Sequence, residues 1–204
     1  RIDVIPMGVS VPPASALPPM LSGPYILHTG GFDIRKNLPV LLQAFQRVTS
    51  QLDPRWRLVL VGAPHSGNSV VYPPIEPGID ELGLHDRVVL TGRVGEREKD
   101  ALYRHATLAV SPSLSEGFGL PILEAMAHGV PVIASNRTSH PEVAGDAAIL
   151  TEPTVDALAE AIARLATDDA LAGELAGKGR ARAAEFPWSH TAQATIETYE
   201  QAAG

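Results

Sequence analysis

The chain has 204 residues, enough for one large domain or two small ones, and 45% of them are hydrophobic, as in an ordinary packed protein. Its 16 lysines and arginines stand against 23 acidic residues, and the net charge of −7 excludes a broad electrostatic surface for nucleic acid or anionic lipid. The absence of cysteine excludes disulfides, thiolate metal sites and cysteine nucleophiles.

Five short apolar runs rich in β-branched residues predict strands, and a polar or glycine-containing turn follows each. These runs cover residues 25–28, 58–61, 88–90, 108–110 and 132–134. Segments with helical spacing lie between them, and the clearest stripe consists of Leu38, Leu41, Leu42, Phe45 and Val48. Because buried parallel strands read as continuous apolar runs, we expect an α/β fold with a doubly wound, Rossmann-like parallel sheet.

A long loop and several C-terminal helices add to this pattern. Residues 63–78 contain four prolines and two glycines, and their apolar residues follow neither the two-residue period of a strand nor the 3.6-residue period of a helix. We therefore expect a long surface loop there. Beyond residue 153 the chain is alanine-rich and helical, with one apolar face formed by Leu158, Ile162 and Leu165 and a further helical pattern over 171–184.

The residues Phe186, Pro187 and Trp188 interrupt the helical pattern, since proline disfavours helix at the residue before it. Ser189 is the expected N-cap of a last helix over about 189–203. We expect that helix to pack back on a single domain spanning 1–204, with Trp188 as its core anchor. No apolar run approaches the roughly 20 residues of a membrane span. The start at Arg1, without methionine, suggests a fragment of a longer polypeptide.

The first candidate binding stretch is residues 29–37, directly after a predicted strand, where open α/β sheets bind ligands. Gly30 and Gly31 let backbone approach a ligand, and Arg35 and Lys36 precede a helix whose free N–H groups favour an anion. Phosphate is the expected ligand. On these residues alone, a glycine turn followed by two solvated cations is the more common explanation.

The second candidate stretch is residues 111–131, which also follows a predicted strand. Its glycines run into Pro121, which suits the first turn of a helix whose amides would form an anion cradle. Glu116 lies in the loop and Glu124 about one helical turn inside, so the two carboxylates could flank a ligand and accept hydrogen bonds from sugar hydroxyls. An ordinary loop charge and a solvated helix residue fit that spacing equally well.

The second stretch also carries a specific resemblance. The run Glu116-Gly117-Phe118-Gly119-Leu120-Pro121, with Glu124 following, is similar to the paired-glutamate signature of glycosyltransferase family 4, retaining enzymes of GT-B architecture. Other stretches resemble that family in the same order, at residues 4–9, 61–62, 90–94, 129–135, 141–143 and 186–188. The resemblance covers nearly the whole chain. It implies the C-terminal, donor-binding lobe of such an enzyme, whose terminal helix often crosses to the other lobe and would here leave part of its apolar face exposed.

By this resemblance, Glu116 would contact the donor sugar and pyrophosphate together with the glycine loop after it, largely through backbone, and Glu124 would hold the ribose. The loop residues are Gly117, Phe118, Gly119 and Leu120. Lys36 matches the family's phosphate-neutralising lysine. Arg35 is its expected assistant, because Phe32 stands near the position where the family often places an arginine. The turn at Gly92, Arg93 and Val94 resembles the family's base-binding edge, where backbone groups read the nucleobase.

The implied reaction is transfer of a hexose with retention, from a nucleotide diphosphate sugar to a glycan or lipid-linked acceptor held by an absent N-terminal lobe. Fixed cations and helix-end amides would stabilise the charge that grows on the leaving diphosphate. Glu116, Arg35 and Lys36 are therefore the expected catalytic residues, and no metal or cofactor is expected, in agreement with the absence of Asp-x-Asp. Asn37 after Arg35 and Lys36 resembles bacterial mannosyltransferases, which favours GDP-mannose.

The resemblance further implies a cytoplasmic protein, with the full-length enzyme at the inner face of a membrane and with no nucleic-acid partner. Two alternatives stay open: a non-catalytic nucleotide- or phosphate-binding module, and a GT-B enzyme of other chemistry, such as a nucleotide-sugar epimerase or a phosphorylase. The seven histidines show no metal-ligand spacing and are expected to be surface or packing residues. His128 is expected to end a helix before Gly129.

Overall fold

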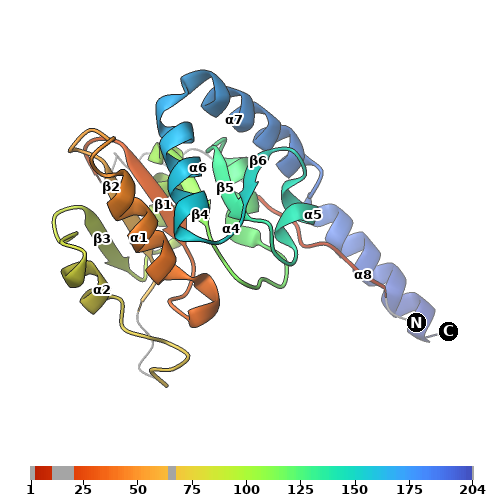
Figure 1. Ribbon diagram of the computed structural model, residues 1–204. Helices are drawn as coiled ribbons and strands as arrows, with labels where there is room; N and C mark the ends of the chain where they lie inside the picture. The colour runs from red at the N-terminus through yellow and green to blue at the C-terminus, as the bar shows by residue number, and fades with distance from the viewer. Residues whose placement is uncertain (1–2, 11–20, 64–67, 204) are drawn as a thin grey trace.

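The computed structural model describes residues 3–10, 21–63 and 68–203. Within them, one parallel sheet has the strand order β3-β2-β1-β4-β5-β6, and helices cover both of its faces (Figure 1). The strands are β1 Tyr25–Thr29, β2 Arg57–Val61, β3 Val88–Gly92, β4 Leu108–Ser111, β5 Val132–Ser135 and β6 Ala148–Thr151. The expected doubly wound α/β fold is confirmed, and its strand order reverses direction between β1 and β4.

The helices connect the strands and continue beyond the last one. They are α1 Leu38–Val48, α2 Glu76–Glu81, α3 Glu96–His105, α4 Leu120–Ala127, α5 His140–Ala144, α6 Val155–Thr167, α7 Asp169–Ala184 and α8 Trp188–Ala203. A short 3-10 turn, η1 Ile34–Lys36, precedes α1. The helical stripe predicted over 38–48 is buried as α1, and the alanine-rich segment forms α6 and α7 as expected.

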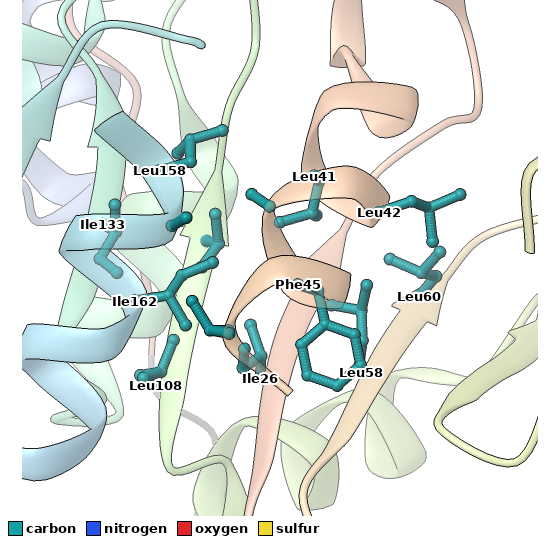
Figure 2. Close-up of a cluster of buried hydrophobic side chains, with 14 of the residues drawn as sticks. Ile26, Leu41, Leu42, Phe45, Leu58, Leu60, Leu108, Ile133, Leu158 and Ile162 are labelled. Carbon is teal, nitrogen blue, oxygen red and sulfur yellow. The ribbon is translucent and has the colours of Figure 1, made fainter. Parts of the chain in front are cut away.

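Two cores lie on opposite faces of the sheet, because successive strand residues point to opposite sides. On one face, Ile26 of β1 and Leu58 of β2 pack against Phe45 of α1, next to α6 (Figure 2). On the other face, Leu27 and Val59 pack in a cluster with α3, α4 and α5. Each core is formed by residues close to fully buried, and together they fix the strand ends from which the candidate site is built.

Two sequence predictions about the elements need correction. The strand β6 was not predicted, because its four residues form only an edge strand and are all partly exposed. The loop expected over 63–78 is interrupted near its end by α2, which begins at Glu76 with Pro77 in its first turn, a position where proline is favoured. Residues 64–67 of that loop lie outside the described residues.

The prediction that the last helix packs back is wrong. No residue of α8 is buried, Trp188 is 46% exposed, and the helix projects away from the sheet (Figure 1). The helix also begins at Trp188, one residue before the expected N-cap Ser189. Phe186, not Trp188, anchors this part of the chain, because it packs against the core beside α4. Its ring lies edge-on to that of Phe118, with the two ring centroids 6.0 Å apart.

The exposure expected for part of the apolar face of this helix is confirmed, since Trp188, Ile196 and Tyr199 are all exposed. The N-terminal segment lies beside the start of α8, where Thr191 donates a hydrogen bond to the carbonyl of Pro6 at 2.8 Å. Within the described residues, no helix is both long enough and apolar enough to span a membrane.

Candidate nucleotide-sugar site

An open cleft of about 360 Å³ lies at the carboxyl ends of β1, β2 and β3, against the start of α4. It is lined by Thr29, Gly30, Val61, Gly62, Arg93, Val94, Lys99, Pro121 and Glu124. The cleft sits beside the point where the strand order reverses, which is where open α/β sheets bind ligands. It brings together parts of both candidate stretches and the predicted base edge.

Gly30 forms the floor of this cleft, and its conformation requires glycine. Its φ of 151° is one that other residues rarely adopt. A Cβ at this position would lie 3.4 Å from Cε and 3.7 Å from Nζ of Lys36. The side chain of Lys36 therefore lies directly over Gly30, at the edge of the cleft. Gly31, by contrast, is exposed in the turn and faces Asp33.

Lys36 and Glu116 form a close ion pair, although 80 residues separate them in the chain. Nζ of Lys36 lies 2.6 Å from Oε1 of Glu116, and each side chain is only 11% exposed. Ser113 Oγ donates a second hydrogen bond to the same oxygen, at 2.7 Å. Burial alone would raise the pKa of Glu116, but the hydrogen bonds from Lys36 and Ser113 outweigh it and hold the pKa below its ordinary value. The carboxylate is therefore ionised at neutral pH.

Arg35 is turned away from this pair. Its guanidinium is bound to Asp33 at 2.7 Å, its side chain is 59% exposed, and its backbone carbonyl accepts a hydrogen bond from the amide of Leu114 in the second stretch. Asn37 also has a structural task, since its side-chain amide donates to the carbonyls of Pro112 and Pro153. The structure thus places Lys36, and not Arg35, next to Glu116.

The glycine loop leads into α4 as predicted. Gly119 is the N-cap with a φ of 104°, Pro121 lies in the first turn, and Glu124 follows one turn later. No hydrogen-bond acceptor within the described residues meets the amides of Gly117, Phe118 and Gly119. Free amides at a helix N-terminus form a site for an anion, because the helix dipole adds to their partial positive charge.

Glu124 is held in place by two donors that lie outside both candidate stretches of the sequence. Lys99 Nζ lies 3.0 Å from Oε1, and the hydroxyl of Tyr103 lies 3.0 Å from Oε2. Tyr103 is buried, and burial followed by the nearby charge of Glu124 raises its pKa well above the usual value, so the phenol is neutral. Its oxygen also lies 2.5 Å from Oγ1 of Thr29 and thereby joins the end of β1 to α4.

Two buried histidines lie near the Lys36–Glu116 pair, and both were expected to be surface or packing residues. His28 lies 2.9 Å, through Nδ1, from the carbonyl of Val110, while its Nε2 is buried with no partner within the described residues. His140 lies 2.9 Å, through Nδ1, from Oγ of Ser135. Burial lowers the pKa of both rings, that of His28 to about 4, so both are neutral at physiological pH.

His128 behaves as the sequence predicted. It is the C-cap of α4, and Gly129 follows with a φ of 72°, a conformation that favours glycine. Its Nε2 lies 2.9 Å from Oδ1 of Asp100, and its ring stacks on Tyr103 with centroids 5.1 Å apart. No group of three or more potential metal ligands occurs in the part of the chain that the structure describes.

Comparison with known proteins agrees with this geometry. The family model "Glycosyl transferases group 1" matches residues 18–182. The chain is 38% identical over 177 residues to the O-antigen chain mannosyltransferase B of Escherichia coli, covering 86% of this chain and 45% of that protein. It is 36% identical over 172 residues to the MMP alpha-(1->4)-mannosyltransferase of Mycolicibacterium hassiacum, covering 82% and 40%. The chain therefore spans less than half the length of these two relatives.

Solved structures show the same fold. The sucrose-phosphate synthase from Thermosynechococcus elongatus superposes with a TM-score of 0.84 at 33% identity, over 98% of this chain and 53% of that one. Anabaena HepE in complex with UDP-glucose superposes with a TM-score of 0.79 at 25% identity, over 88% and 49%. The expected resemblance in sequence and fold is thereby confirmed, and this chain belongs to the group 1 glycosyl transferases, with the Rossmann-like lobe of their GT-B architecture.

Proposed function

We propose that this chain is the donor-binding lobe of a retaining mannosyltransferase that takes its sugar from GDP-mannose. The observation that carries the proposal is the shared cleft: Glu124 lines it together with Gly30 and Arg93, and Lys36 lies over Gly30 beside Glu116. The two relatives compared above are both named as mannosyltransferases, and a further relative, from Xanthomonas campestris, is named for GDP-mannose and is 28% identical.

The proposed ligand pose follows from the charges. The diphosphate would lie over the free amides of Gly117, Phe118 and Gly119, next to the ammonium of Lys36. Glu124 would accept the ribose hydroxyls, and backbone groups at Arg93 and Val94 would meet the base. A module that bound phosphate alone would have no use for a second, hydroxyl-accepting carboxylate in the cleft, so Glu124 favours a sugar nucleotide.

The chemistry assigned to this chain is electrostatic. As the bond between the anomeric carbon and phosphate breaks, negative charge grows on the leaving diphosphate, and Lys36 with the helix-end amides would stabilise it. Glu116, ionised and largely buried, would hold hydroxyls of the donor sugar. Arg35 would add its charge only after its guanidinium leaves Asp33.

The rest of the reaction is assigned to the longer protein. The acceptor, a glycan or a lipid-linked glycan, would be held by an N-terminal lobe, and the exposed face of α8 would contact that lobe. We place the enzyme in the cytoplasm, peripheral to the inner face of a membrane where its acceptor is lipid-linked. We expect no metal ion in the donor site.

Calorimetric titration of the chain with GDP, UDP and ADP tests the proposal. We expect binding of GDP in the micromolar to low millimolar range, weaker binding of the other two, and a loss of roughly tenfold or more for GDP in Lys36→Met, because a charge-assisted contact to phosphate is removed. If none of the three nucleotides binds at millimolar concentration, the donor site is wrongly assigned.

A further inference from the structure

One polar atom beside the proposed donor site is unexplained by the contacts described so far. Nε2 of His28 is buried and has no hydrogen-bond partner within the described residues. A buried polar atom without a partner is costly, and such atoms are rare in folded proteins unless they have a task. His28 ends in the space around Gly30, where a Cβ would lie 3.6 Å from Nε2 and 3.7 Å from Nζ of Lys36.

The hydrogen-bonding state of this imidazole is fixed by its surroundings. Nδ1 lies 2.9 Å from the carbonyl of Val110, and a carbonyl only accepts, so Nδ1 carries the proton and donates it. Burial lowers the pKa of His28 to about 4, so at neutral pH the ring has a single proton. Nε2 therefore presents a lone pair and requires a donor.

Lys36 is a donor with spare capacity. Its ammonium group has three N–H bonds, and within the described residues the acceptor recorded for it is Oε1 of Glu116, which also accepts from Ser113. The proposed function asks Glu116 to hold sugar hydroxyls and Lys36 to face the diphosphate. With Glu116 drawn toward the sugar, the diphosphate takes one N–H of the ammonium, and an N–H that had pointed to Glu116 is left for another acceptor near Gly30.

Resting on the proposed function, we propose that His28 is a positioning residue for Lys36: in the donor-bound protein, Nε2 of His28 accepts a hydrogen bond from the Lys36 ammonium and keeps that cation over Gly30 beside the diphosphate. His28 itself does not touch the ligand, because Gly30 lies between them and the ring is buried. The role depends on Nε2, whereas a purely structural role would depend on the Nδ1 bond to Val110.

Two substitutions separate these roles. In His28→Asn, the side-chain amide nitrogen can replace Nδ1 and donate to Val110, but nothing replaces the Nε2 acceptor. In His28→Gln, the longer side chain can place its carbonyl oxygen near the position of Nε2, but the short bond to Val110 is lost. His190→Asn, at an exposed position on α8 far from the cleft, is the matched control.

The test measures the affinity of the four proteins for GDP-mannose, GDP and inorganic pyrophosphate by calorimetry, after circular dichroism has established that each variant is folded. We expect His28→Asn to bind GDP-mannose roughly tenfold more weakly, with a smaller loss for GDP, because only the sugar draws Glu116 away. We expect His28→Gln to recover most of the affinity and the control to match the wild type.

A spectroscopic readout accompanies the affinities. The ¹⁵N signal of the Lys36 ammonium, assigned by its disappearance in Lys36→Met, should be protected from exchange with GDP-mannose bound in the wild type and in His28→Gln, and unprotected in His28→Asn. Affinities and protection in His28→Asn equal to those of the wild type, or a loss in His28→Gln as large as in His28→Asn, would overturn the inference while leaving the proposed function intact. Failure of the wild type to bind any of the three probes would overturn both.

Discussion

Replacement of Glu124 by glutamine removes the charge that we expect to hold the ribose while keeping the side chain's size. Both oxygens of this carboxylate already accept from donors, Lys99 and Tyr103, so the new amide nitrogen would face one donor or the other. One acceptor is then lost to the ligand, and the remaining oxygen is neutral. Hydrogen bonds to charged groups contribute about 1.5–3 kcal/mol and neutral ones about 1 kcal/mol. The expected loss in GDP binding is therefore about 1–2 kcal/mol, or roughly 5- to 30-fold in Kd.

The assay is calorimetric titration with GDP and with inorganic pyrophosphate at one salt concentration. Pyrophosphate lacks the ribose, so its affinity should change by less than about twofold in Glu124→Gln. The control is Glu160→Gln, which removes an exposed carboxylate on α6, outside the cleft, and should leave both affinities unchanged. The reasoning is refuted if Glu124→Gln binds GDP as the wild type does, or if pyrophosphate binding falls as much as GDP binding.

Three other expectations concern the scaffold. Gly62→Ala should lower the free energy of unfolding by about 2 kcal/mol or more, because its Cβ would lie 2.2 Å from the carbonyl oxygen of Gly30 at a φ of 148°; an unchanged urea midpoint would contradict the backbone contact. The pKa of His28 is 6.5 in the unfolded chain and about 4 in the folded one, so the unfolded chain takes up a proton first as the pH falls. With respect to this group the free energy of unfolding is therefore highest above pH 6.5, and it decreases by up to about 3 kcal/mol as the pH falls toward 4. Urea unfolding at several pH values should show that the free energy of unfolding depends less steeply on pH in His28→Asn than in the wild type. Equal slopes in the two proteins would refute the lowered pKa of His28. Ile196→Ser and Tyr199→Ser should change stability by less than about 0.5 kcal/mol, since both side chains are exposed; a large fall in the thermal midpoint would show that α8 packs on the domain after all.

The parts of the fold that could be predicted are those whose signal lies within a short stretch of sequence. The apolar run at β2 and the helical stripe of α1 are each visible within a few consecutive residues, so pattern and structure agree. The edge strand β6 has four half-buried residues, too few to give a period. The choice of Phe186 over Trp188 as the anchor depends on how the chain turns after α7, which no local pattern encodes.

The candidate site divides in the same way. Glu116, Glu124 and the glycine loop belong to one continuous motif, and Lys36 follows a glycine turn, so the sequence could point to all of them. Tyr103 could not be found in this way, because it meets Thr29 across 74 residues and its role depends on the packing of α3 against α4. The pairing of Lys36 with Glu116, which explains why Arg35 stands apart, also required the structure.

A crystal structure of this chain with GDP bound tests the central claim most directly. The account predicts the diphosphate over the amides of Gly117 to Gly119, within hydrogen-bond distance of Nζ of Lys36, and the ribose hydroxyls on the carboxylate of Glu124. Density for GDP on another surface, with the cleft between Gly30 and Glu124 empty, would contradict it.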